Sequence, residues 1–370
     1  MKWNWQQKDW PNFKYDKAIL ESFESQFLKK EGMLLGAFKH LGEDDKNDLK
    51  IEIISNEALK TSKIEGEYLN RESVQSSIRR EFGLGTDHRK VSPAEQGISE
   101  LMVDLYQTFQ EPLTHKKLFL WHEMLTKGRR DLKDIGRYRT HKEFMQVISG
   151  DIHHLKIHFE APPSSKINEE MDRFLMWFHQ TGPSGSSPLL GLSRAGIAHL
   201  YFVCIHPFED GNGRIGRVLA EKALAQSFGE PTLTALSYTI EKHRRAYYEA
   251  LENVNKSNEV TEWLVYFSQT ILDAQQYTQQ YIEFLIEKTK IYDRFGEKLN
   301  ERQKKVLSRM FREGPEGFEG GLSAENYISI TKTSRATTTR DLQELVFFGI
   351  LKKSGELRHA RYSFVFFPCF

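Results

Sequence analysis

The sequence has few cysteines, no excess of one charge and no long apolar run, and each absence excludes a class of protein. Its 370 residues hold only Cys204 and Cys369, so there is no disulfide framework and a reducing compartment is expected. Lys and Arg number 52 against 51 Asp and Glu, so net charge gives no reason for unspecific binding to nucleic acid or acidic membranes. No stretch approaches the roughly 18 consecutive apolar residues of a membrane span, and the N-terminus lacks the apolar run of a signal peptide. We expect a cytoplasmic protein with no membrane partner.

Several metal and nucleotide motifs are also missing. The chain contains no C-x-x-C, H-E-x-x-H or Walker A sequence. GNGRIG at 211–216 is a formal match to the dinucleotide pattern G-x-G-x-x-G, but no strand precedes it in a βαβ unit. We therefore discount a dinucleotide-binding fold.

The spacing of apolar residues predicts a mainly α-helical chain. Steps of three and four residues recur through 15–81 and through most of 167–286. Glycine and proline in FGLGTDHRKVSP, at 82–93, mark a boundary between these regions. We expect three domains, which are a helical region at 1–92, a larger central domain at 93–292 and a smaller one at 300–370.

One stretch departs from helical spacing. Leu155, Ile157 and Phe159 alternate with polar residues, which predicts a strand, and the preceding segment QVIS is its expected partner in a hairpin. His154 and His158 have the spacing of helical zinc ligands, but in an extended strand they would lie ~13 Å apart. A zinc ion shared by these two histidines is therefore excluded.

The segment CIHPFEDGNGRIGRVLAEK, residues 204–222, places charged residues and glycines between two helix-forming runs. Gly211 and Gly213 allow a tight turn and a close approach of the backbone to a ligand. The second helix is expected to begin near Arg214, where unpaired N–H groups and the helix dipole favour an anion. Arg214 and Arg217 stand there instead, and the dipole alone disfavours them. The two guanidinium groups therefore need an anion beside them, and a polyphosphate between them would supply it.

Two further side chains complete a candidate phosphoryl or nucleotidyl transfer site. His206 is the only group of the segment that accepts a proton near neutral pH. Asp210 is available for a magnesium ion that bridges phosphates. The alternative is a polar loop with a structural histidine, and the residues by themselves leave both interpretations open.

The motif carries a resemblance to a known family. Residues 206–217, HPFEDGNGRIGR, match the H-P-F-x-D/E-G-N-G-R-x-x-R signature of Fic domains without a mismatch. GRYRT, HFEAPP and the last seventy residues also resemble a common multidomain bacterial Fic architecture, and the aromatic N-terminus resembles an uncharacterised domain fused to it. The resemblance implies an all-helical Fic core with a small β-hairpin flap, a helical N-terminal region and a C-terminal winged helix.

Fic domains with this motif mostly transfer AMP from ATP to a hydroxyl of a protein and release pyrophosphate. The resemblance therefore implies a protein adenylyltransferase that uses ATP and Mg²⁺ and that also modifies itself. It makes His206 the base for a Ser, Thr or Tyr hydroxyl and Asp210 the ligand of Mg²⁺. The remaining motif residues are implied to hold the ATP phosphates, and they are Gly211, Asn212, Gly213, Arg214 and Arg217.

The resemblance also assigns residues around the motif. Lysine replaces Gly213 in the branch that transfers phosphate, so AMP transfer is favoured here, while transfer of phosphocholine is not excluded. AYYEALENVN resembles the segment that contacts adenine, which implies Tyr248 and Asn255, although Tyr248 as ordinary helix core is an equal alternative. The hairpin at about 146–160 resembles the flap that docks an extended segment of the target protein by strand addition.

A second motif lies upstream. In a helix over about 51–66, Glu65 shares the expected buried face with Ile54 and Ala58, and a carboxylate there needs a cation. TSKIEG at 61–66 also matches the inhibitory motif S/T-x-x-x-E-G/N of the family. The resemblance implies that Glu65 pairs with Arg217 in place of the γ-phosphate and keeps the enzyme mostly off. Some relatives use this glutamate to remove AMP, which the sequence leaves open.

The last seventy residues predict three helices, the third capped by Ser334, and a hairpin around Ser354 and Gly355. This order is typical of a winged helix. Residues 301–370 hold 12 Lys and Arg against 8 Asp and Glu, and Arg335 and Arg340 lie on the presumed recognition helix. DNA, a docked protein and a homodimer are all open as partners of this domain.

Three functions are compatible with the sequence. The leading hypothesis is an autoinhibited protein adenylyltransferase. A DNA-binding regulator with a nucleotide-sensing Fic domain is the alternative from another class. A Fic transferase that uses another nucleotide-linked donor, or that removes AMP, is the third.

Overall fold

The computed structural model of the protein describes residues 2–85, 89–149, 155–232, 234–314, 317–318 and 320–366. Within these ranges the chain forms two compact units. The first comprises Met1–Gly36 and Asn47–Thr278, and the second comprises Ala37–Lys46 and Gln279–Phe370. The domain boundaries expected near residues 92 and 292 stay predictions.

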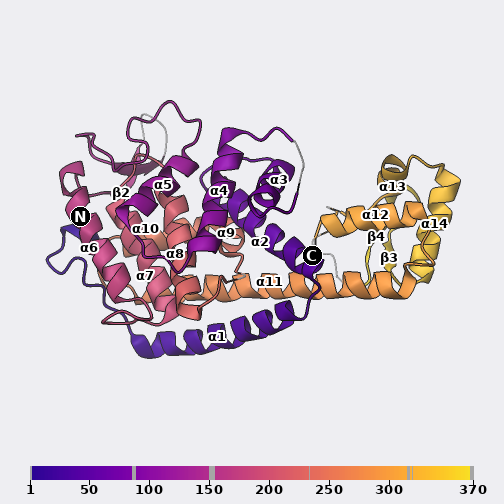
Figure 1. Ribbon diagram of the computed structural model, residues 1–370, viewed down its shortest axis with the longest axis horizontal. Coiled ribbons are helices and arrows are strands. Elements are labelled where there is room, and N and C mark those ends of the chain that lie inside the picture. Colours follow the sequence, from indigo (N-terminus) through magenta and orange to yellow (C-terminus); the bar gives the residue numbers. More distant parts are fainter. Residues whose placement is uncertain are drawn as a thin grey trace. The chain divides into compact units, whose positions relative to one another are not determined.

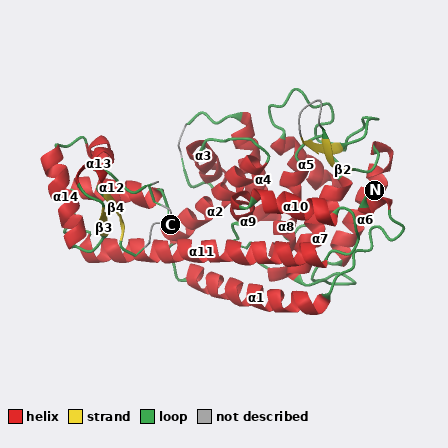
Figure 2. Ribbon diagram, turned by 180° about the vertical axis from the view of Figure 1, so that it is seen from behind, coloured by secondary structure: helices red, strands yellow, loops and turns green. Residues whose placement is uncertain are grey.

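The described part of the chain is mainly α-helical with two small antiparallel hairpins, which confirms the predicted fold class (Figures 1 and 2). Up to the end of α11, the longer elements are α1 (Lys17–Lys39), α2 (Glu43–Ile64), α3 (Arg71–Glu81), α4 (Pro93–Thr108), α5 (His115–Leu125), β1 (Gln146–Ser149), β2 (Lys156–Glu160), α6 (Ile167–Gln180), α7 (Gly191–Ile205), α8 (Asn212–Phe228), α9 (Leu236–Lys242), α10 (Arg244–Val254) and α11 (Thr261–Phe295). Short 3₁₀ turns lie at Asn4–Gln6 and Ser164–Lys166.

Local sequence explains where several of these helices begin and end. Ser92 and Glu95 form a capping box at the start of α4, with a proline in the first turn. Gly229, at φ 89°, ends α8 in the left-handed conformation that glycine adopts without strain. The hydrophobic core of the first unit centres on α7, which is buried along nearly its whole length and packs on α8. The two helices that flank the motif are therefore held rigidly by the core.

The hairpin predicted from alternation is present. β1 pairs antiparallel with β2, and Val147 lies opposite Phe159. Phe159 is buried, but Ile157 is 47% exposed and Leu155 is 55% exposed, so the alternating apolar face is only partly covered. The turn of the hairpin, including His154, lies outside the described residues.

The N-terminal segment packs against α7 and the end of β2. The Trp10 ring meets Tyr201 of α7 edge to face at 5.1 Å. Trp5 donates from Nε1 to the carbonyl of Glu160 at the end of β2, over 2.6 Å. Asn4 is fully buried, and its N–H donates to the carbonyl of Asn255 at 2.8 Å. These contacts tie the hairpin to the end of α10.

The second unit contains the predicted three helices and hairpin, which are α12 (Glu301–Arg312), α13 (Ala324–Thr331), α14 (Arg335–Phe347), β3 (Leu351–Ser354) and β4 (Arg361–Phe364). Ser334 caps α14 as expected, since its hydroxyl accepts from Thr337 N–H at 3.3 Å. The hairpin expected around Ser354 and Gly355 is present, since β3 pairs antiparallel with β4, and a 3₁₀ turn, Leu357–His359, lengthens the connection between the two strands. Among the described residues, no helix is both long and apolar enough to cross a membrane.

Candidate active site

The motif segment forms the loop between α7 and α8. The loop follows Ile205 and ends where α8 begins at Asn212. His206 adopts a left-handed φ of 53°, and Gly211 adopts a φ of 87°. Helix α8 begins at Asn212, slightly before the start expected near Arg214, because the left-handed Gly211 turns the chain into the helix.

His206 lies in the wall of a cavity of about 740 Å³, a volume in the usual range for small-ligand pockets. Its Nδ1 lies 3.0 Å from the carbonyl of Val203, which can only accept, so Nδ1 carries the proton and Nε2 is left as the acceptor. Burial lowers the pKa of His206 to about 4, although the bond to Val203 raises it. The imidazole is therefore neutral near pH 7 and able to take a proton. Other residues that line this cavity include Glu65, Asp210, Gly211, Tyr248 and Asn255.

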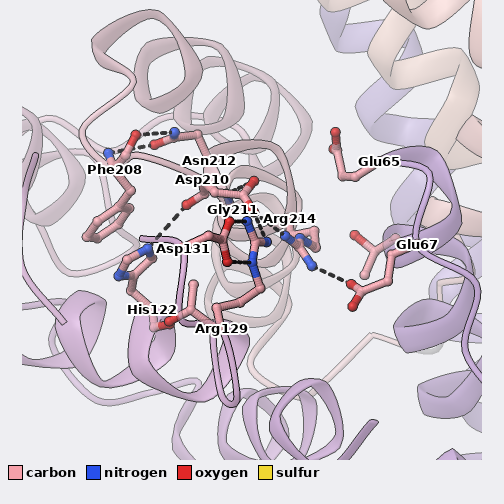
Figure 3. A network of polar contacts seen from close by, with 12 residues as sticks. Glu65, Glu67, His122, Arg129, Asp131, Phe208, Asp210, Gly211, Asn212 and Arg214 are labelled. Carbon is pink, nitrogen blue, oxygen red and sulfur yellow. Dashed lines mark hydrogen bonds and ion pairs between the residues drawn. The ribbon is translucent and has the colours of Figure 1, made fainter. Parts of the chain in front are cut away.

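Asn212 holds the shape of the loop. Its Oδ1 accepts from the N–H of Phe208 at 2.9 Å, and its Nδ2 donates to the carbonyl of Phe208 at 2.8 Å (Figure 3). Phe208 is fully buried. The side chain of Asn212, expected to line the phosphate turn, is thus directed into the loop itself.

His122 supports the loop from α5. Its ring stacks on Phe208 with a centroid separation of 4.1 Å. Its Nδ1 accepts from the N–H of Gly136 at 3.1 Å, so Nε2 carries the proton and donates to the carbonyl of Asp210 at 3.2 Å. Burial lowers the pKa of His122 to about 4. A neutral imidazole therefore positions the motif loop.

Arg217 is buried and is bound by the end of α2. Its Nε donates to Thr61 Oγ1 at 2.7 Å, and its Nη2 donates to the carbonyl of Thr61 at 3.0 Å and to Glu65 Oε1 at 2.7 Å. The structure thus brings together the arginine and the glutamate that the sequence paired. The inward helical face expected for Glu65 is wrong, because α2 ends at Ile64 and the Glu65 side chain is 30% exposed. Gly66, at φ 87°, turns the chain directly after it.

Arg214 has different partners. Its Nη1 lies 2.7 Å from Glu67 Oε2, and its Nη2 lies 3.2 Å from Asp210 Oδ2. The same Asp210 oxygen lies 2.7 Å from Nη1 of Arg129. Burial would raise the pKa of Asp210, but Arg214 and Arg129 hold it below the usual value. Glu67, rather than Glu65, is therefore the acidic partner of Arg214 from the segment after α2.

Asp210 has the chemistry of a magnesium ligand. Mg²⁺ in proteins is bound by one or two carboxylates, with phosphate oxygens and water completing the shell. In the described part of the chain, no three His, Cys, Asp or Glu side chains gather as a metal cluster. One carboxylate beside a phosphate-binding turn fits an ion that arrives with a nucleotide. In the present arrangement Asp210 Oδ2 is in contact with two guanidinium groups, and Oδ1 accepts from Gly211 N–H at 2.7 Å.

Comparison with known families identifies this loop. Residues 112–224 match the Fic/DOC family. These residues form a Fic domain. Residues 3–84 match a domain of unknown function, DUF4172. The motif loop lies within the Fic match, and Glu65 and Glu67 lie within the DUF4172 match.

Several proteins named protein adenylyltransferase are similar to part of this chain. One from Nematostella vectensis is 29% identical over 123 residues, which is 33% of this chain and 24% of the relative. Fic-1 from Caenorhabditis elegans is 24% identical over 169 residues, which is 46% of this chain and 29% of that protein. One from Drosophila melanogaster is 33% identical over 88 residues, which is 24% of this chain and 16% of the relative. The chain thus spans less than a third of the length of each of these relatives.

Solved structures show the same fold. A Fic family protein from Desulfovibrio desulfuricans aligns with a TM-score of 0.54 at 18% identity, over 96% of this chain and 98% of that chain. Residues 134–508 of C. elegans Fic-1 align with a TM-score of 0.50 at 19% identity, over 72% of this chain and 75% of that chain.

Both residues expected to contact adenine face the cavity beside the Fic domain motif. Tyr248 is 37% exposed and donates to the carbonyl of Ile64 at 3.3 Å, so its interpretation as helix core is wrong. The buried position belongs to its neighbour Tyr247. Asn255 donates from Nδ2 to the carbonyl of His158 at 3.0 Å, which joins α10 to β2.

The hairpin borders the same cavity. Val147 and Ile148 of β1 line it, and both side chains are exposed. Lys156 and His158 of β2 bind Glu252 of α10 at 2.9 and 2.7 Å. The hairpin therefore presents apolar side chains next to the Fic loop while polar contacts hold it in place.

Three side chains at the site were not found from the sequence. They are Glu67, His122 and Arg129, and only the place of Glu67 directly after the inhibitory motif offered a signal. His122 resembles any histidine in an amphipathic helix. Arg129 stands in a charged loop, where arginines are usually solvated.

Proposed function

We propose that this protein is an autoinhibited protein adenylyltransferase, which transfers AMP from ATP to a hydroxyl group of a target protein. One observation carries the proposal. The neutral His206 lines the cavity, and its Nε2 is available as an acceptor. The helix that follows the same loop carries two buried arginines in its first turns. A base and paired cations on one short loop and helix start are what transfer from a polyphosphate requires.

The reaction needs little beyond positioning and one base. The target hydroxyl oxygen attacks the α-phosphorus of ATP, and His206 Nε2 takes its proton. The bond from the α-phosphorus to the bridging oxygen breaks, and pyrophosphate leaves with the electron pair. Arg214 and Arg217 offset the charge on the departing phosphates. Asp210 would hold Mg²⁺, which neutralises phosphate charge when bound.

Recognition of both substrates follows from the walls of the cavity. Tyr248 presents its ring to the cavity and is proposed to stack on adenine, with Asn255 beside it. The hairpin at about 146–160 is proposed to bind an extended segment of the target by strand addition, since its apolar side chains are exposed next to the motif. The names of the similar proteins support ATP and a protein as the two substrates.

Glu65 is proposed to keep the enzyme off. Its carboxylate lies 2.7 Å from Arg217, so a phosphate has to displace it to reach the guanidinium. Arg217 is 2% exposed, and a buried cation that exchanges one anion for another avoids an unpaired charge.

Labelling with ATP tests the proposal. Wild type, Glu65→Gly and His206→Ala are incubated with Mg²⁺ and ATP labelled in the α-phosphate, and mass spectrometry locates AMP adducts on the protein and on candidate targets. We expect more labelling with Glu65→Gly and none with His206→Ala. Equal labelling of all three forms contradicts both assignments, and an adduct other than AMP indicates another donor.

A second candidate function, DNA binding, concerns the second unit. Arg335 on α14 is 72% exposed and Arg340 is exposed as well, which is compatible with DNA binding. A rise in melting temperature of the nucleotide-free protein with duplex DNA would favour the regulator.

A further inference from the structure

A chain of alternating charges runs through the candidate nucleotide site (Figure 3). Asp131 binds Arg129 through two contacts, at 2.8 and 2.6 Å. Arg129 binds Asp210 at 2.7 Å, Asp210 binds Arg214 at 3.2 Å, and Arg214 binds Glu67 at 2.7 Å. Each group that the proposed function assigns to metal or phosphate therefore already has an internal partner of opposite charge.

Burial makes the partners of Arg214 matter. The Arg214 side chain is 6% exposed, and a buried guanidinium without a counter-ion is strongly destabilising. Glu67 and Asp210 balance its charge through the two terminal nitrogens. A nucleotide phosphate requires the same N–H donors, so it competes with Glu67.

One turn of backbone delivers both inhibitory carboxylates. Glu65 and Glu67 both donate their N–H groups to the carbonyl of Ser62, at 3.1 and 3.0 Å. Gly66 between them is left-handed, which directs both side chains toward α8. The end of α2 is thus one rigid piece that covers Arg217 and Arg214 at once.

Arg129 meets the other side of the site. Its Nη1 contacts Asp210 Oδ2, the oxygen that Arg214 also contacts, and Asp131 orients the guanidinium. The loop after it is fixed by Glu209, which accepts from the N–H groups of Lys133 and Asp134 at 2.7 and 2.9 Å. A guanidinium held in this way competes with Mg²⁺ for the carboxylate.

We propose that Glu67 and Arg129 form a second lock on the nucleotide site, in which Glu67 occupies Arg214 and Arg129 takes the place of the metal on Asp210. The inference rests on the proposed function and extends its regulation. Removal of Glu65 alone takes away the carboxylate partner of Arg217 but leaves Arg214 and Asp210 paired. Full opening requires that the end of α2 withdraws and that Arg129 releases Asp210.

Binding of ATP, rather than turnover, tests this lock. The starting protein carries Glu65→Gly and His206→Ala, so that nucleotide binds without being consumed, and Glu67→Gln or Arg129→Gln is added. Titration calorimetry gives the Kd for ATP at saturating Mg²⁺ and the Mg²⁺ concentration that half-saturates ATP binding. Matched controls are Glu143→Gln, whose side chain is 85% exposed, and Arg130→Gln in the same loop as Arg129.

Each substitution has its own signature. Glu67→Gln should lower the Kd for ATP about threefold, as expected for loss of a partly exposed competing ion pair. Arg129→Gln should lower the Mg²⁺ requirement about threefold, whereas mere loss of a positive charge near phosphates would weaken ATP binding. Arg129→Lys keeps the charge, and its Mg²⁺ requirement should lie between those of the starting protein and of Arg129→Gln. The controls should match the starting protein.

The outcomes separate the two proposals. If the starting protein binds ATP and neither substitution changes the Kd or the Mg²⁺ requirement, the second lock is overturned and the proposed function stands. The proposed function fails, and the lock with it, if no variant binds ATP. Circular dichroism and thermal unfolding show that each variant is folded before it is titrated.

Discussion

A side chain at position 213 would collide with Glu65. A Cβ built on Gly213 lies 2.3 Å from Glu65 Oε1 and 3.3 Å from Arg217 Nη1. The absence of a side chain at this point of the motif is therefore what allows the Glu65 carboxylate to reach Arg217. Glycine in the phosphate turn and glutamate in the distant helix end are two parts of one contact.

Gly213→Ala should fold and yet weaken the contact between Glu65 and Arg217, because the colliding atom is at the end of a flexible side chain. A double-mutant cycle of Gly213→Ala with Glu65→Ala, read as free energy of unfolding without nucleotide, should give a coupling of about 0.5–1.5 kcal/mol. Gly36→Ala is the control, since the added Cβ meets nothing within 4 Å there. Additive effects at position 213 would show that the two residues do not interact.

Asn212→Ala should destabilise the protein because it leaves both backbone groups of Phe208 without a partner. Two buried unsatisfied groups cost roughly 2–5 kcal/mol in the free energy of unfolding. Asn212→Asp keeps the acceptor for the Phe208 N–H but places a second oxygen against the Phe208 carbonyl at a buried position, so it should destabilise the protein as well. Chemical denaturation measures both variants, and a fully stable Asn212→Ala would show that the loop keeps its shape without this side chain.

The free energy of unfolding of Glu57→Gln should increase relative to that of wild type as pH rises. Glu57 accepts from the N–H of Ser237 at 2.8 Å at the start of α9, and burial raises its pKa to about 7. Between pH 4.5 and 7 the unfolded chain therefore releases a proton that the folded protein retains, so this group loses stability as pH rises through that window. Glutamine does not titrate, and the gain relative to wild type should reach up to about 3 kcal/mol.

Unfolding of wild type and Glu57→Gln at pH 5 and pH 8 measures the difference. Glu241→Gln is the contrasting control. Burial raises the pKa of Glu241, but Lys63 and Lys60 lower it by more, so it stays below the usual value. The contribution of the Glu241 carboxylate to the free energy of unfolding is therefore lost only at a pH below the interval from pH 5 to pH 8. Substitution of Glu241 should have nearly the same effect at both pH values. An equal effect of Glu57→Gln at both values would contradict the raised pKa.

Much of the fold was predictable because the signals are local. The helix at 301–312, the cap at Ser334 and the paired strands of the hairpin depend on residues within a few positions of each other. The same holds for the left-handed turn at Gly66, which follows from a helix end and a glycine. Short-range spacing is therefore enough to predict these features.

The partners within the site were less predictable. Glu67 and Arg129 reach Arg214 and Asp210 across 147 and 81 positions of sequence. Nothing in a lone glutamate or arginine distinguishes such a partner from a solvated surface charge. Even Glu65, which a motif singled out, lies after the end of α2 and not on its buried face.

The amino-acid sequence by itself determined the helices, the turn after His206, and the collection of base, acid and arginines in that turn and in the first turns of α8. The tertiary structure alone decided which carboxylate meets which guanidinium. The reason is that ion pairs and hydrogen bonds act over a few ångströms, so their membership depends on how helices dock rather than on spacing along the chain. Docking of α2 against α8 places Glu65 on Arg217 and Glu67 on Arg214.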